Sequence, residues 1–168
     1  TSSNPMKMHA TDFFKNGKLL RKRIRSHPAY PYGFLREEMQ EHILDKLEAM
    51  ITQRLIRGTF ENGTEYTIIA VALNLPKEVT RLIQQFDFTK KNPKLIYVVT
   101  SEALPSLEDS IYVTLLSLIG FDVLFFVPTG YNIEGYFNKS LMEEHQLGDY
   151  LYDLQVPDWR TVPRTLHT

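Results

Sequence analysis

Two short runs of the chain contain no polar residue, residues 95–99 (LIYVV) and 123–127 (VLFFV). Each has the length and the β-branched and aromatic content of a strand. Between them, residues 107–119 form an apolar stretch of helical length that ends at Gly120. Strands that are apolar on both faces are typical of a parallel sheet covered on both sides, with a right-handed helical crossover. We therefore predict two adjacent, largely buried parallel strands with helix 107–119 packed across them.

The preceding part of the chain has the periodicity of helices. Residues 35–56 show one apolar stripe at three- and four-residue spacing, which predicts a helix that Gly58 ends in a left-handed conformation. The stripe consists of Leu35, Met39, Ile43, Leu47, Met50, Ile51 and Leu55. Residues 66–73 fit a buried strand or a buried helix. We favour a helix, because Pro76 is well placed at the first position of a second helix that ends near Phe86.

Together these elements predict one α/β domain. A small parallel sheet with a Rossmann-like strand-helix-strand unit, residues 94–132, follows a helical part, residues 35–86. The chain has 168 residues and is 43% apolar, enough for one sizeable core. Two strands make a thin sheet, so we expect an exposed sheet edge or apolar face. Because the chain begins at Thr1 and not at Met, we expect a C-terminal fragment of a longer protein.

Four other segments give weaker signals. We expect residues 1–11 to be loose and the proline-rich residues 27–34 to be extended or turned, with His27 bonded locally. Residues 138–145 are predicted to be helical. Glu143, Glu144 and His145 lack a second histidine at the spacing of a helical zinc site, so we predict no metal.

The amino-acid composition limits the cellular locations and the kinds of crosslink expected for this chain. Cysteine is absent, which excludes disulfides and thiolate metal sites and favours the cytoplasm. No apolar run approaches the length that crosses a bilayer, so we expect no membrane partner.

Charge is uneven along the chain although the net charge is only −1. Residues 1–57 contain eleven Lys and Arg against six acids, whereas residues 101–158 contain one, Lys139, against ten acids. The basic run consists of Lys15, Lys18, Arg21, Lys22, Arg23 and Arg25. Since only aliphatic residues are interleaved with it, base stacking is unsupported. We therefore predict solvated or intramolecular charge and no nucleic-acid partner.

A candidate site follows the ends of the two strands, where open α/β sheets place their ligands. Pro128, Thr129, Gly130, Tyr131 and Asn132 form a sharp turn whose amides are suited to an anion, so a phosphate-bearing small molecule is the predicted ligand.

Two acids belong to the same predicted site. Glu102 and Glu108 would coexist with a phosphate by holding a hydrated magnesium ion that bridges to it. Neither the spacing of a dinucleotide fingerprint nor that of a P-loop is present. The alternative is structural: Ser106 and Asp109 are a capping pair for helix 107–119, and the polar loop residues serve as caps and turns.

Three long phrases resemble one known family. They are FDFTKKNPKLIYV, PSLEDSIYVTLLSLIGFDVLFFVPTGYNIEGYF and EEHQLGDYLYDLQVPDW. They are similar to the C-terminal region of the YceG-like family over roughly residues 43–159. The resemblance implies a component of a biosynthetic module encoded beside bacterial tellurium-resistance and general stress genes, in a protein longer than this chain. It transfers no catalytic residue and no cofactor.

Two functions remain open at this point. The chain is either a transferase-like enzyme domain that acts on a nucleotide or sugar-phosphate, or a non-catalytic module. Such a module would dock other proteins of the same operon or the N-terminal part of its own longer chain. The polar residues gathered at one sheet edge favour the enzyme, and the absence of a nucleophile or metal motif in the sequence weighs against it.

Overall fold

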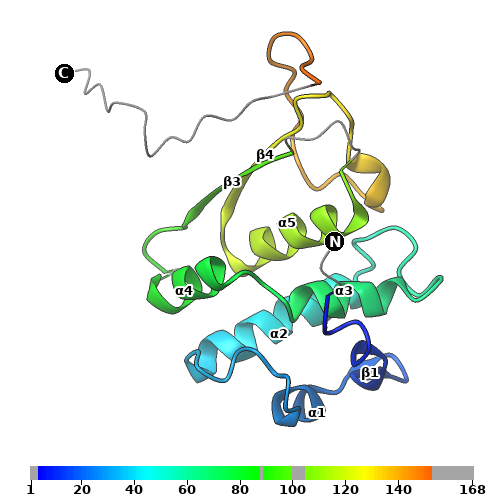
Figure 1. The fold of residues 1–168 in the computed structure, drawn as a ribbon, viewed down its shortest axis with the longest axis vertical. Helices are drawn as coiled ribbons and strands as arrows, with labels where there is room; N and C mark the ends of the chain where they lie inside the picture. Colours follow the sequence, from blue (N-terminus) through cyan, green and yellow to red (C-terminus); the bar gives the residue numbers. More distant parts are fainter. Residues whose placement is uncertain (1–3, 88, 100–104, 153–168) are drawn as a thin grey trace.

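The computed structural model describes residues 4–87, 89–99 and 105–152. Figure 1 shows a helical layer at one end and a two-stranded sheet at the other, with one helix between them. In chain order the elements are η1 (Ala10–Asp12), β1 (Phe14–Lys15), β2 (Lys18–Leu19), α1 (Arg21–Ser26), α2 (Glu37–Thr52), α3 (Thr64–Ala72), α4 (Lys77–Gln85), β3 (Lys94–Val98), α5 (Leu107–Ile119), β4 (Asp122–Phe126) and η2 (Glu134–Tyr136).

Helix α5 is the central element of this arrangement. It lies between the sheet and the helical layer, with β4 on one side and α2 and α3 on the other (Figure 1). Its buried side chains point in both directions: Ser110, Ile111, Val113, Thr114, Leu115, Leu116 and Ile119. The prediction of a helix at 107–119 is confirmed with the same bounds. A helix that is apolar nearly all round is one that packs on two layers at once.

Strands β3 and β4 are parallel neighbours, as predicted, and each begins one residue earlier than expected. The paired residues are Lys94 and Asp122, Leu95 and Val123, Ile96 and Leu124, Tyr97 and Phe125, and Val98 and Phe126. Leu95, Val123 and Phe125 pack against the core on the α5 side. The strand-helix-strand crossover over α5 therefore has the expected topology.

The expected burial of both strands is wrong. Ile96, Val98, Leu124 and Phe126 point away from α5, and we call them the outer face. Ile96 is 65% exposed, Leu124 is 52% exposed and Phe126 is 39% exposed. The reason is that α5 covers one side of the sheet and no other described element covers the opposite side (Figure 1). The expected exposed apolar face is thus confirmed.

The long helix α2 is confirmed but ends earlier than predicted. Arg54, with a φ of 50°, already takes the left-handed conformation after the last turn of α2, and Gly58, with a φ of 79°, does so only four residues further on. Two contacts hold Arg54 there: its guanidinium lies 5.0 Å from the centre of the Phe60 ring, and Asn138 donates its side-chain amide to the Arg54 carbonyl at 2.7 Å. Tertiary contacts therefore override the preference of that conformation for glycine.

Three further predictions about local structure have different outcomes. The helix preferred at residues 66–73 is confirmed as α3, whereas Pro76 is the N-cap of α4 and not its first residue. The amide of Ala29 donates to Nδ1 of His27 at 3.1 Å, which confirms the local hydrogen bond expected there.

Two expectations about loose and helical segments are wrong. Residues 4–11, the described part of the N-terminal segment, are docked and not loose, because Met6 and Ala10 are buried in the core; residues 1–3 lie outside the described residues. Residues 138–145 form no helix, because Asn138 is bonded through its amide to Leu55 and through its side chain to Arg54.

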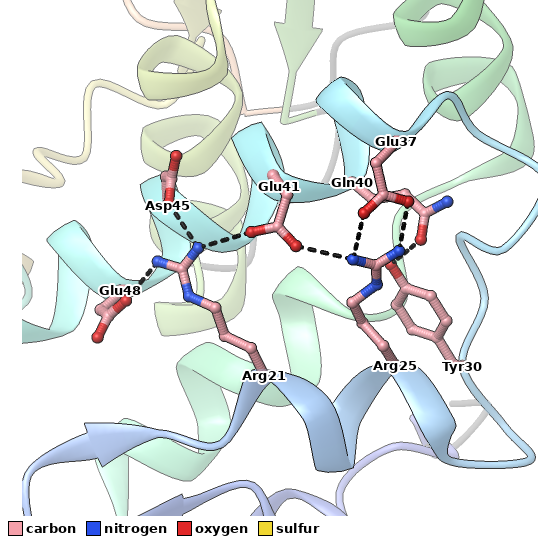
Figure 2. A network of polar contacts seen from close by, with 8 residues as sticks. All are labelled: Arg21, Arg25, Tyr30, Glu37, Gln40, Glu41, Asp45 and Glu48. Atoms are coloured by element: carbon pink, nitrogen blue, oxygen red, sulfur yellow. Dashed lines mark hydrogen bonds and ion pairs between the residues drawn. The ribbon is translucent and has the colours of Figure 1, made fainter.

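Two members of the basic run, Arg21 and Arg25, are paired within the fold, and the other four are exposed, which agrees with the predicted solvated or intramolecular charge. Arg21 pairs with Glu41, Asp45 and Glu48 at nitrogen–oxygen distances of 3.0, 2.6 and 2.5 Å (Figure 2). These acids lie on the face of α2 that is turned toward α1. Intramolecular pairing therefore accounts for the most contacted member of the run.

Arg25 docks the other end of α1. It donates to both carboxylate oxygens of Glu37 at 2.6 Å and to Glu41 at 2.9 Å (Figure 2). The hydrogen bonds from Arg25 lower the pKa of Glu37 below its ordinary value of 4.5. A carboxyl whose folded pKa is lowered stabilises the fold above its unfolded pKa, so this contribution is lost as the pH falls below about 4.5 through the lowered folded value.

We predict that Arg21→Gln lowers the free energy of unfolding by about 1 kcal/mol, because three partly exposed carboxylates lose a shared partner. The matched control is Arg23→Gln, which changes an exposed residue of the same helix for which no ion pair is found among the described residues. Urea unfolding at low and high salt measures the free energy of unfolding of both variants. Equal stabilities of the two variants at low salt would show that the network does not hold α1 on α2.

Candidate functional site

The predicted turn lies at the carboxyl end of β4. The amide of Gly130 donates to the Val127 carbonyl at 2.9 Å, and Gly130 has a φ of 75°. This left-handed value suits glycine and strains any residue with a Cβ. The sharp turn expected from the sequence is therefore present.

The turn is covered by a later part of the chain. The amide of Leu151 donates to the Pro128 carbonyl at 2.8 Å. The ring of Tyr150 lies over Gly130, so that a Cβ added at Gly130 would come within 2.2 Å of it. Gly130→Val would therefore displace Tyr150 and strain the backbone.

Asn132 is used locally. Its side-chain oxygen accepts from the amide of Glu134, and its side-chain nitrogen donates to Glu144 at 3.1 Å. Tyr131 is 41% exposed. Thr129 is buried, and its hydroxyl has no hydrogen-bond partner among the described residues. Two of the five predicted turn residues, Gly130 and Asn132, thus have structural roles that need no ligand.

The N-terminus of α5 is closed by its own side chains. The Ser106 hydroxyl accepts from the amide of Asp109 at 3.1 Å, and the Asp109 carboxylate accepts from the amide of Ser106 at 2.8 Å. This capping box satisfies amides that an anion would otherwise use. Glu108 is paired with Lys7 at 3.4 Å. A phosphate at this end of α5 would meet two carboxylates and few free amides.

Glu102 lies outside the described residues, so the hydrated magnesium ion that Glu102 and Glu108 would hold against a phosphate stays a prediction. Among the described residues, no group of three or more His, Cys, Asp or Glu side chains is placed to hold a metal ion.

A cleft of about 690 Å³ opens beside the capped end of α5. Glu108 lines it, together with Lys7, Asn74, Tyr97 and Tyr112. The turn residues 129–132 are not among its lining residues. The structure therefore places Glu108 and the predicted turn in different surroundings.

Two tyrosines of this cleft have altered acidity. The Tyr97 hydroxyl donates to Asp109 at 2.6 Å, and burial together with that hydrogen bond raises the pKa of Tyr97. Burial raises the pKa of Tyr112 to about 12, with a smaller contribution from the charge of Glu78. A raised pKa keeps a phenol neutral at neutral pH, so both side chains present neutral hydroxyl groups to the cleft.

Sequence reasoning missed most of the cleft. Lys7 and Asn74 come from segments distant in sequence from α5, and no local pattern marks them. Tyr97 had a usable signal, because its place in an alternating strand puts it on the face toward α5.

Comparison with known proteins decides the family. The family model of the YceG domain matches residues 2–155. The chain belongs to the YceG domain family. The match spans both the helical layer and the strand-helix-strand unit, so these belong to one YceG domain and confirm the resemblance seen in the sequence.

Other comparisons add no relative. No curated protein matches this YceG domain, and no solved structure matches it. None of the described helices combines the length and apolar character that a membrane span requires.

We predict that Ser106→Ala lowers the free energy of unfolding of the YceG domain by about 1 kcal/mol, because the amide of Asp109 loses its acceptor. The control is Ser117→Ala, an exposed serine of the same helix that makes no cap. Thermal unfolding of both variants tests it. If Ser106→Ala were as stable as Ser117→Ala, the capping box would not be what satisfies this helix end.

Proposed function

We propose that this YceG domain is a docking module of a bacterial tellurium-resistance and stress-response biosynthetic module, and that it binds another protein of the same operon through the outer face. The observation that supports the proposal is the exposure of Ile96, Leu124 and Phe126 on a parallel sheet. Parallel sheets are normally covered on both faces, because their strands are apolar on both.

The energetics indicate how large the contact has to be. Full burial of an Ile, Leu or Phe side chain contributes about 1.5–3 kcal/mol. Covering the exposed fractions of Ile96, Leu124 and Phe126 therefore contributes on the order of 2–5 kcal/mol. Association costs about 4–15 kcal/mol in lost freedom of motion. The outer face alone is too small to hold a partner, so contacts around it must contribute as well.

The open strand edges are one source of further contact. Among the described residues β3 and β4 pair only with each other, so the far edge of each strand presents backbone groups to a partner. A partner that adds a strand at one edge would gain main-chain hydrogen bonds while it covers the outer face.

A transferase-like enzyme acting on a nucleotide or sugar-phosphate is the second candidate. The cleft beside α5 favours it, since a cavity with convergent polar groups is the usual place for a small ligand. The capping box and the carboxylate of Glu108 weigh against a phosphate there, which is why we place docking first.

The test is co-expression of the YceG domain with each product of the adjacent operon genes, followed by size-exclusion chromatography. We expect one product to co-elute with the parent and to be lost from Leu124→Ser. The matched control is Phe34→Ser, which changes an apolar residue that is 59% exposed and lies in the loop before α2. Both variants should melt close to the parent, because neither side chain is part of the core.

The proposal is wrong if Leu124→Ser retains every partner that Phe34→Ser retains, or if no operon product co-elutes with the parent.

A further inference from the structure

We propose that the docking surface continues from the outer face onto the segment after β4, residues 127–152, and that it binds a basic amphipathic segment of a partner protein. Such a segment has an apolar stripe flanked by Lys and Arg. The apolar half of this inference rests on the proposed function, whereas the basic half rests on separate observations of charge.

The acidic residues of this segment are held next to the end of β4. Residues 143–151 fold back on the turn, since Leu151 bonds Pro128, Tyr150 covers Gly130, and Glu144 accepts from Asn132. Glu134 begins η2 directly after the turn, and Asp149 directly precedes Tyr150. The acids therefore gather where the outer face ends at Phe126.

These acids lack compensating positive charge. Glu134 and Asp149 are exposed and have no ion pair among the described residues. Glu144 accepts from the neutral amide of Asn132, and Glu143 faces His145 at 3.6 Å. Lys139 is the one Lys or Arg in residues 127–152.

Several basic residues elsewhere in the chain already have acidic partners. Arg21 and Arg25 are paired with α2 (Figure 2), Lys7 is paired with Glu108, and Lys94 is paired with Asp122 at the opposite end of the sheet. The charge that would balance the acids after β4 is therefore better supplied by another molecule.

The same segment adds apolar and aromatic surface. Tyr131, Tyr150, Leu151 and Tyr152 are between 41% and 55% exposed. Exposed aromatic rings are enriched at protein interfaces, and their faces attract Lys and Arg. The apolar outer face therefore lies beside exposed aromatic rings and beside the unpaired acids, which we call the acidic border. Together they fit a partner segment in which apolar and basic residues alternate.

This chemistry selects against other partners. Nucleic acids and anionic membrane surfaces have the same sign as the acidic border, so their approach is unfavourable. A second copy of this chain would bring two acidic borders together.

The test measures binding of the full 168-residue chain to fluorescent synthetic peptides by anisotropy. The probe is a short peptide of alternating Leu and Lys. The controls are a Leu and Glu peptide and a Ser and Lys peptide of the same length. We expect the Leu and Lys peptide to bind at least about tenfold more tightly than either control, and to weaken as salt is raised.

Variants separate the two halves of the surface. Leu124→Ser should weaken the Leu and Lys peptide by removing apolar contact. Glu144→Gln combined with Asp149→Asn should weaken it by removing charge, while Gln keeps the acceptor for Asn132. The control pair is Glu38→Gln with Glu61→Gln, which removes two exposed acids from the helical layer and should bind as the parent does.

The outcomes distinguish this inference from the proposed function. If Leu124→Ser alone weakens binding and the acid variants bind as the parent does, the basic partner is wrong and apolar docking stands. If Leu124→Ser binds the peptide as the parent does, the outer face is not part of the binding surface, and both the inference and the proposed function are wrong. Tighter binding of an anionic phospholipid vesicle or an oligonucleotide than of the Leu and Lys peptide would also overturn the inference.

Discussion

The packing of α5 on two layers is the contact on which the rest of this domain depends. Its buried residues meet α2 and α3 on one side and the sheet on the other, and its capping box starts the helix at the point where β3 has ended. Because α5 is also the crossover between β3 and β4, the same helix sets their parallel pairing. One helix cannot cover both faces of a sheet, and the exposed outer face is the direct consequence.

The sequence was sufficient for most of the elements, although not for residues 138–145, and insufficient for their surroundings. The run at residues 95–99 predicted a strand correctly, because its composition is local information. It predicted burial wrongly, because an apolar strand needs a cover that the described chain does not supply for Ile96. The end of α2 failed for a similar reason, since Asn138 and Phe60 hold Arg54 from outside the helix.

The candidate site shows the same division. The turn at Gly130 could be predicted from Pro-Thr-Gly, because the preference for a positive φ is a property of the residue. The ring of Tyr150 over that turn, and the pairing of Lys7 with Glu108 across the cleft, join residues far apart in the chain. Neither could be read from spacing, and both change what the site is suited to bind.

Charged residues also divide into those that are paired within the chain and those that are exposed to solvent. Arg21 and Arg25 of the basic N-terminal run are matched by acids on α2, whereas the acids after β4 face solvent beside apolar residues. A stripe of exposed Ile and Leu beside unpaired carboxylates is a poor surface for an isolated domain and a suitable one for an interface.

Amide hydrogen exchange tests the central claim most directly, when the YceG domain alone is compared with the domain bound to a partner protein of the kind proposed above. The account predicts that amides of β3, β4 and residues 127–135 exchange readily in the isolated domain and become protected in the complex, while α2 and α3 are unchanged. Protection confined to the helical layer, with β3 and β4 unaffected, would contradict it.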